Sequence, residues 1–229
     1  MLRRNPIAIA IAVLALAPAL PAQAADPLSS SFWEVSYLNS TVDFGTPTKD
    51  EIEGFRAGVS VGILPYLNFV ADSDQRRYQD SRERFSSVGL AGHTLDPAWQ
   101  AFGAVTYELS KFDDNLSSGG DHSEEGYGVQ LGGRAAIENM EFHASYKYMD
   151  LGQVTPTVTL TGSRYGAGVV LDLSSWWSLA ADYTVRTHTY ETTGSSADVE
   201  YQEWTVGFRR YIATQADRRN RHGGLLGGE

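Results

Sequence analysis

Apolar and polar residues alternate along much of this chain. From Phe55 to Ile63 every odd position is apolar, and every even position is Arg, Gly or Ser. A period of two is typical of a β-strand with one apolar face and one polar face. The same alternation recurs along the chain and predicts an all-β fold.

Ten stretches of this kind are predicted as strands. An even number of antiparallel strands brings both ends of a barrel domain to the same side. The predicted strands are residues 32–42, 53–64, 66–78, 84–95, 98–112, 125–137, 140–150, 163–173, 175–190 and 200–212.

The predicted connections alternate in length. Short turns are expected at Leu64-Pro65-Tyr66, Asp96-Pro97, Glu138-Asn139 and Ser174-Ser175, and long loops near residues 43–52, 79–83, 113–124, 151–162 and 191–199. Long loops on one side and short turns on the other are typical of outer-membrane barrels. We therefore predict a closed antiparallel up-and-down transmembrane β-barrel of about ten strands. The alternative is a soluble sandwich or lipocalin-like barrel, whose apolar face would be turned inward.

Large aromatic residues share the apolar face of the predicted strands. They gather beside the short turns and near the long loops, as in the two interfacial girdles of a membrane barrel. The predicted girdle residues are Trp33, Trp99 and Trp177 on the short-turn side, and Tyr107, Tyr127 and Tyr148 on the long-loop side. The alternative is that β-strands in general are rich in aromatics.

The opposite face carries charges of both signs. A buried unpaired charge is very costly, so we expect these side chains to form an ion-pair network inside a narrow or plugged lumen. The predicted network residues are Glu34, Arg56, Asp72, Glu108, Arg134, Lys147, Arg164, Asp182, Arg186, Glu203 and Arg209. The same face also carries Asp74, Glu141, Asp172, His143 and His188.

The first residues have the features of an export signal. Arg3 and Arg4 precede an apolar run over residues 7–17, and Ala22-Gln23-Ala24 supplies small residues for cleavage. We predict a signal peptide at residues 1–24, a barrel domain at 25–212 and a disordered basic periplasmic tail at 213–229.

Composition and charge exclude several classes of functional site and partner. The chain has no cysteine, which excludes a disulfide scaffold, a zinc-thiolate site and thiol catalysis. Its formal net charge of −10 argues against nucleic acid as the main partner. Twelve acids lie in or beside three predicted loops, where we expect them to keep the loops solvated, with loose Ca²⁺ or Mg²⁺ binding as the alternative. They are Asp43, Asp50, Glu51, Glu53, Asp113, Asp114, Asp121, Glu124, Glu125, Glu191, Asp198 and Glu200.

Residues that could act as acids and bases do not form a catalytic motif. His143 with Ser145 and Glu141, or Asp182 with His188, could be drawn as such sets. Residues two apart on one strand face form a column, which is also how an ion-pair ladder is built. The sequence therefore predicts no catalytic residue, no metal site and no cofactor.

One predicted connection is basic. Arg76, Arg77, Arg82 and Arg84 cluster around Asp80 and Glu83. Arginines at the outer rim of a barrel suit lipid phosphates. This cluster predicts a contact with lipopolysaccharide.

Several short motifs resemble those of known barrels. Residues 126–134 (GYGVQLGGR), 148–152 (YMDLG) and 179–183 (LAADY) are similar to strands of the OmpA/OmpX-like (opacity-type porin) superfamily of small outer-membrane barrels. More narrowly, they resemble a xanthomonad-type barrel family associated with quorum sensing and plant immunity. Residues 204–212 (WTVGFRRYI) are similar to the closing strand that the barrel assembly machinery recognises, except that Arg210 and Ile212 replace aromatics. The resemblance implies the outer membrane of a Gram-negative bacterium.

These features predict one function and leave three alternatives open. The expected function is a non-enzymatic outer-membrane barrel with a largely closed charged lumen and five surface loops, in a structural or surface-interaction role. The alternative is a narrow porin-like channel for small solutes or ions. A membrane-embedded hydrolase at the loop rim and a soluble ligand-binding barrel are further rivals.

Overall fold

A computed structural model describes residues 31–45, 49–78, 81–96, 98–113, 122–155, 157–174 and 176–212. The predicted signal peptide and the predicted tail lie outside the described residues. No helix in the described ranges is long and apolar enough to cross a bilayer.

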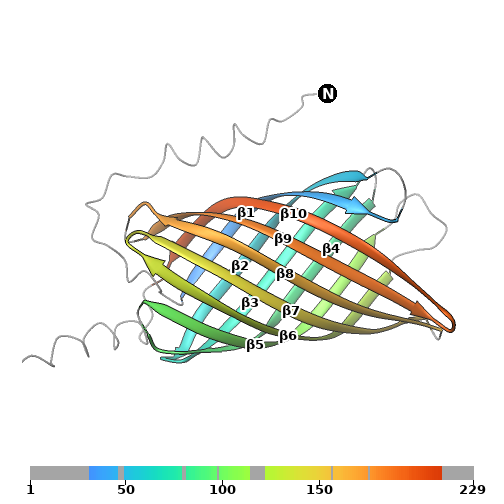
Figure 1. Cartoon of the computed structure of the whole chain (residues 1–229), viewed down its shortest axis with the longest axis horizontal. Helices are drawn as coiled ribbons and strands as arrows, with labels where there is room; N and C mark the ends of the chain where they lie inside the picture. The colour runs from blue at the N-terminus through green and yellow to red at the C-terminus, as the bar shows by residue number, and fades with distance from the viewer. Residues whose placement is uncertain are drawn as a thin grey trace, which may run out of the picture.

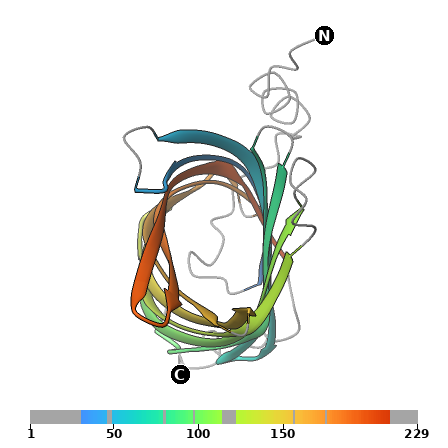
Figure 2. The same ribbon diagram turned by 90° about the vertical axis from the view of Figure 1, so that its right-hand side faces the viewer.

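Ten antiparallel strands close into one barrel, in which each strand pairs with its neighbours in sequence and β1 pairs with β10 (Figures 1 and 2). This confirms the predicted fold. The strands are β1 (Phe32–Asp43), β2 (Asp50–Leu64), β3 (Leu67–Tyr78), β4 (Ser81–His93), β5 (Trp99–Asp113), β6 (His122–Ile137), β7 (Met140–Thr155), β8 (Val158–Asp172), β9 (Trp177–Thr192) and β10 (Ser195–Tyr211).

The barrel has two distinct ends. At the terminal end, to the left in Figure 1, β1 begins, β10 ends and the short turns lie where they were predicted. There the Asp96 carboxylate accepts hydrogen bonds from the backbone amides of Ala98 and Trp99, at 2.8 and 3.1 Å. At the distal end, to the right in Figure 1, the other five connections lie.

The distal connections are shorter than predicted. Strands β7 and β8 leave only residues 156–157 between them, and β9 and β10 are joined by a turn at Thr193 and Gly194, with Gly194 at φ 97°. The long loops expected at residues 79–83, 151–162 and 191–199 were therefore wrong. The outward face of these strand ends is polar, so the apolar alternation that marks a membrane-facing strand stops before the hydrogen-bonded ladder does.

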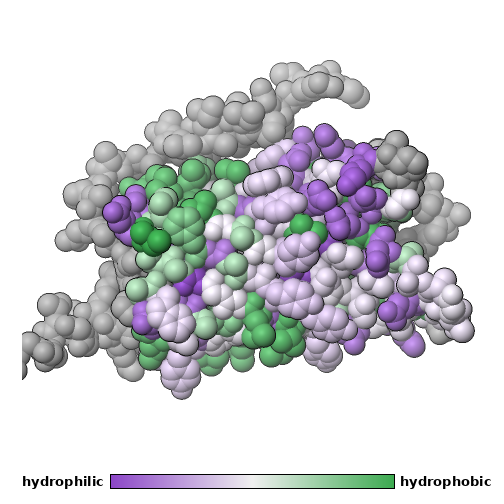
Figure 3. Space-filling model, in the orientation of Figure 1, coloured by the Kyte–Doolittle hydropathy of each residue, from purple (hydrophilic) through white to green (hydrophobic). Residues whose placement is uncertain are grey.

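The acidic residues assigned to loops are affected by the same error. Seven acids expected in loops lie within strands, near their distal ends: Asp43, Asp50, Glu51, Asp113, Glu124, Glu191 and Asp198. The two ends of the barrel therefore differ in the polarity of their strands rather than in loop length alone. Figure 3 shows this difference on one face, which is apolar over the terminal half and hydrophilic toward the distal end.

Close packing inside the barrel explains one of its strand glycines. A Cβ atom on Gly128 would lie 2.6 Å from Glu108 Oε1 and 2.8 Å from Lys147 Cε. The space that a side chain would need at this position is already filled by an interior ion pair. Only glycine fits here without displacing the pair.

Candidate functional site: the charged interior

A cluster of charged side chains crosses the lumen. Strands β2 and β3 contribute Arg56, Asp74 and Arg76, while β9 and β10, on the other side of β1, contribute Arg186 and Glu203. Arg56 Nε lies 2.6 Å from Asp74 Oδ1, and Arg56 Nη2 lies 2.9 Å from Glu203 Oε2. Arg186 Nη2 lies 2.6 Å from Asp74 Oδ2. Arg76 donates to both Glu203 and Asp74. We call these five residues the central cluster.

The central cluster is deeply buried. Residue exposure is 0% for Glu203 and 1% for both Asp74 and Arg76. Glu83 adds a third carboxylate, with its Oε2 at 3.4 Å from Arg76 Nη1. Three guanidinium groups therefore face three carboxylates. Such a balance is what makes buried charges tolerable, because each charge has a partner of opposite sign.

Aromatic rings cover the central cluster on its distal side. The Arg186 guanidinium lies 4.4 Å from the centre of the Phe85 ring, and Arg76 lies 4.9 Å from the centre of the Tyr201 ring. His188 packs edge-on against both rings. These stacked contacts suit arginine, whose flat guanidinium is weakly hydrated.

Apolar side chains fill the distal lumen beyond these rings. One buried group joins Val42 and Ile52 to Tyr201. A second group comprises Met149, Leu151 and Leu160. The distal half of the lumen is therefore closed by two layers, one ionic and one apolar.

A second set of ion pairs lies near the terminal end. Arg209 Nε lies 2.9 Å from Glu34 Oε2, and Arg209 Nη1 lies 3.3 Å from Glu141 Oε1. Arg134 Nη1 lies 3.9 Å from the same Glu141. Arg209 also stacks on the ring of Phe32, at 4.1 Å.

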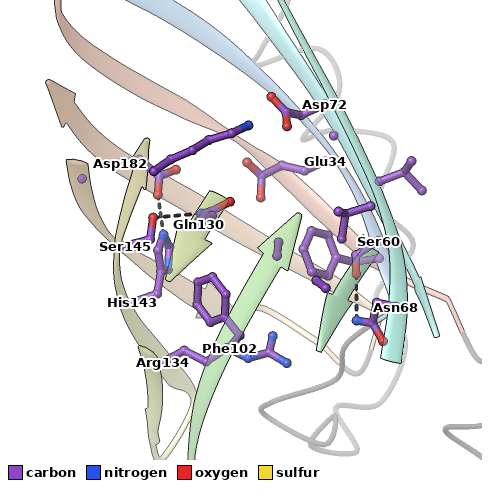
Figure 4. Close-up of a pocket in the computed structure, with 18 of the residues that line it drawn as sticks. Glu34, Ser60, Asn68, Asp72, Phe102, Gln130, Arg134, His143, Ser145 and Asp182 are labelled. Carbon is purple, nitrogen blue, oxygen red and sulfur yellow. Dashed lines mark hydrogen bonds and ion pairs between the residues drawn. The ribbon is translucent and has the colours of Figure 1, made fainter. Parts of the chain in front are cut away.

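A cavity of about 290 Å³ separates the two sets of charges (Figure 4). Its lining runs from Phe32 and Asn68 near the terminal end to Arg56 and Arg164 at the level of the central cluster. One part of the wall carries Phe102 and small apolar residues, and the part across from it carries polar side chains. The interior is therefore plugged distally but hollow toward the terminal end.

All eleven predicted network residues are placed on the inside of the barrel wall. Besides the pairs above, Lys147 Nζ lies 2.7 Å from Glu108 Oε1, Arg164 Nη1 lies 3.9 Å from Asp72 Oδ1, and Asp182 pairs with His143. Sequence reasoning missed Arg76 and Glu83 as members. The signal was present, because Arg76 continues the inward column of Asp72 and Asp74 on β3.

The assignment of Arg76 to a lipopolysaccharide contact is therefore wrong. Strand parity turns its side chain into the lumen, where it is 1% exposed and ion-paired. The other three residues of that prediction, Arg77, Arg82 and Arg84, point outward and are exposed.

The candidate acid–base groups are brought together only in part, since His143 Nδ1 lies 3.8 Å from Glu141 Oε1. Ser145 Oγ accepts a hydrogen bond from Gln130 Nε2 at 3.1 Å, and His143 Nε2 lies 2.6 Å from Asp182 Oδ1 (Figure 4). Within the described ranges no hydrogen bond joins Ser145 to His143. The geometry therefore does not bring a nucleophile to a base.

The predicted girdle residues lie on the outer face, with Trp33, Trp99 and Trp177 at strand ends and the three tyrosines further along β5, β6 and β7. Trp99, Tyr107, Tyr127 and Tyr148 are 54%, 40%, 69% and 46% exposed. Tyr107 and Tyr127 pack edge-on with ring centres 6.1 Å apart. In a second group, Trp33 packs on Trp177 at 5.6 Å, and the Arg210 guanidinium lies 5.3 Å from the Trp177 ring.

These features define the class of structure: a closed ten-stranded antiparallel barrel with an interior filled largely by ion pairs. Three solved barrels are similar to this chain. Neisserial surface protein A (NspA) shares 12% sequence identity at a TM-score of 0.42, covering 80% of this chain and 98% of its own. Ail of Yersinia pestis shares 14% identity at 0.38, covering 80% and 99%. The outer membrane protease OmpT of Escherichia coli shares 10% at 0.44, covering 80% and 94%. No family model and no curated protein matches the chain.

Proposed function

We propose that this chain is a barrel of the Gram-negative outer membrane that performs no chemistry. Its interior is closed, and its rigid wall displays five connections at the distal end for a structural or surface-interaction role. The observation that carries this proposal is the central cluster, which ties β2 and β3 to β9 and β10 across the lumen.

The outer face supports a membrane location. Leu90, Val105, Val129 and Leu131 are between 49% and 64% exposed, on neighbouring strands between the aromatic groups. An exposed apolar band of this kind is costly in water and favourable in lipid. The soluble-barrel alternative would place such residues inside, where this chain carries its charges.

Gel migration tests the location. A folded membrane barrel resists detergent, so the unboiled protein should migrate differently from the boiled protein and should fractionate with the outer membrane. If the chain fractionates with the soluble periplasm and its migration does not change on boiling, the proposed location is wrong.

A narrow channel is the second candidate function. The cavity between the two sets of charges favours it, because a charged hollow already reaches from the terminal end to the central cluster. Conduction would then require the central cluster and the apolar layer to rearrange.

Planar-bilayer recordings separate the two functions. The closed barrel should insert without unitary current steps, whereas a channel should give steps of reproducible size. Insertion must be verified independently, for example by protection from protease after reconstitution. The absence of current steps then shows that the lumen of the inserted barrel is closed.

The finer assignments are also part of this proposal. The motifs at residues 126–134 and 204–212 support membership of an OmpA/OmpX-like superfamily, nearest the xanthomonad-type family, and delivery by the barrel assembly machinery. Replacing Tyr211 at the end of the closing strand should reduce outer-membrane insertion in cells if the assembly machinery reads this strand.

A further inference from the structure

Four cations gather on the outer face of β3, β4 and β5 near the distal end. Strand alternation sends Arg76 and Glu83 into the lumen and turns Arg77, Arg82 and Arg84 outward. Lys111 of β5 lies on the same outward face, in register with Arg84. We call Arg77, Arg82, Arg84 and Lys111 the rim patch.

The register places like charges opposite each other in the rim patch. Arg77 pairs with Arg82 across β3 and β4, and Arg84 pairs with Lys111 across β4 and β5. Side chains in directly opposed positions have Cβ atoms about 5 Å apart, and like charges there destabilise a sheet. The opposed arginines Arg77 and Arg82 therefore favour an anion between them.

Acidic positions of this chain also lie beside the rim patch. Glu53 of β2 is in register with Arg77, and Asp113 of β5 is in register with Arg82. Glu125 of β6 lies on the outward face too, in register with Leu109, two residues from Lys111. The cations that carry the argument for an anion are therefore Arg77 and Arg82, which oppose each other directly.

The height of the rim patch on the wall indicates what the anion is. On the same strands, Val88 lies four residues from Arg84, or about 13 Å along the strand, on the side of the apolar band. Tyr107 and Tyr127 lie in register with Val88 on β5 and β6. Arg84 and Lys111 therefore lie about 13 Å along their strands from the tyrosines, on the distal side, where lipid phosphates meet a membrane barrel.

We infer that the rim patch binds the phosphate groups of lipopolysaccharide. Guanidinium groups grip phosphate oxygens through paired hydrogen bonds, and a doubly charged phosphate relieves the repulsion between the opposed cations. The inference rests on the proposed outer-membrane location. It replaces Arg76 of the sequence-based cluster with Lys111.

The test measures binding of bisphosphorylated lipid A to the refolded full-length chain in a neutral detergent. The parent protein should bind lipid A in a salt-sensitive manner, and dephosphorylated lipid A should not bind. Arg77→Gln combined with Arg82→Gln should weaken binding by about tenfold or more, through the lost charge-assisted contacts. Arg77→Lys combined with Arg82→Lys should retain part of the affinity, because the charge remains while the planar fork is lost.

A matched control makes the same change in net charge elsewhere. Ser196→Glu combined with Ala197→Glu adds two negative charges at exposed positions of β10, also at the distal end but four strands away from β4 in the barrel. This control should bind lipid A like the parent. If it loses affinity as the arginine variant does, the effect is one of net charge and the site assignment is wrong.

Two further outcomes overturn the inference. Equal binding by the parent and the glutamine variant removes the rim patch as a site. Equal binding of phosphatidylglycerol vesicles and lipid A assigns the patch to anionic lipid in general. Heat-modifiable migration of each variant is recorded in parallel. A variant that still migrates as a folded barrel but binds lipid A like the parent contradicts the binding site alone. A parent protein without heat-modifiable migration contradicts the proposed membrane location.

Discussion

Arg186 on β9 donates a hydrogen bond to Asp74 on β3 across the lumen, with 2.6 Å between Nη2 and Oδ2. The two residues are 112 positions apart in sequence, and their strands are separated by three others around the wall. Asp74 also accepts two hydrogen bonds from Arg56 on the adjacent strand. One carboxylate therefore holds together distant parts of the barrel wall.

Removing that carboxylate should destabilise the barrel strongly. In Asp74→Ala, Arg56 and Arg186 lose a shared partner while remaining buried, which costs about 3–5 kcal/mol of unfolding free energy. Urea unfolding in detergent, followed by tryptophan fluorescence, measures the loss.

Asp72→Ala is the matched control on the same face of the same strand. The Asp72 side chain is 38% exposed and lies 3.9 Å from Arg164, so its loss should cost about 1 kcal/mol or less. Similar costs for the two variants would show that Asp74 has no special role in closing the lumen.

The residues that point into the lumen can largely be predicted from the sequence, because side chains of a strand alternate between its two faces. Once Phe55 to Ile63 fixes which face of β2 is apolar, Arg56 must point inward, and the same logic places Glu203 and Arg209 on β10. Partner choice does not follow in this way. The acid that pairs with Arg186 depends on how the barrel closes and on the shift in register around it. The sequence of a single strand determines neither.

The distal ends were harder to predict for a physical reason. A membrane-facing strand must alternate, but a strand that extends beyond the bilayer has water on its outer face. The outward face of residues 151–162 and 191–199 is polar there and apolar residues such as Leu151 and Leu160 point inward, so the expected pattern is lost and these segments read as loops although their backbones are paired. The misplacement of Arg76 arose similarly, because residues around 76–84 were read as a rim cluster rather than as two alternating strands.

Substitutions at two glycines should distinguish the filled part of the lumen from the cavity. A Cβ at this position would overlap the ends of the Glu108 and Lys147 side chains, so Gly128→Ala should shift this ion pair and destabilise the fold by about 1 kcal/mol. Gly58→Ala is the control, since its nearest described contacts lie 3.9 Å away and the cavity adjoins it. Equal unfolding midpoints for the two variants would contradict the packing described at Gly128.

The Lys147–Glu108 pair should behave as a unit. Both side chains are buried, with 2.7 Å between Lys147 Nζ and Glu108 Oε1. Lys147→Met alone leaves a buried carboxylate without its cation and should cost about 3–5 kcal/mol. The double variant Lys147→Met with Glu108→Leu should recover much of that loss. A double-mutant cycle of unfolding free energies measures the coupling, and additive costs would show that the two charges do not depend on each other.

Two tryptophans should report the depth of the barrel in a bilayer. Trp204 lies at mid-strand on β10 and is 60% exposed, whereas Trp99 begins β5 at the terminal end and is 54% exposed. In variants that keep one of these tryptophans and replace the other four with Phe, the protein is reconstituted into vesicles of brominated lipids. Both tryptophans should be quenched more by bromines near the headgroups than by bromines deep in the acyl chains, because interfacial aromatics sit at the headgroup level. Trp99 lies at the terminal interface, and Trp204 lies about as far from the terminal end of its strand as the girdle residue Tyr107 does. Equal, weak quenching of both by every lipid would indicate that the outward apolar face does not contact a membrane.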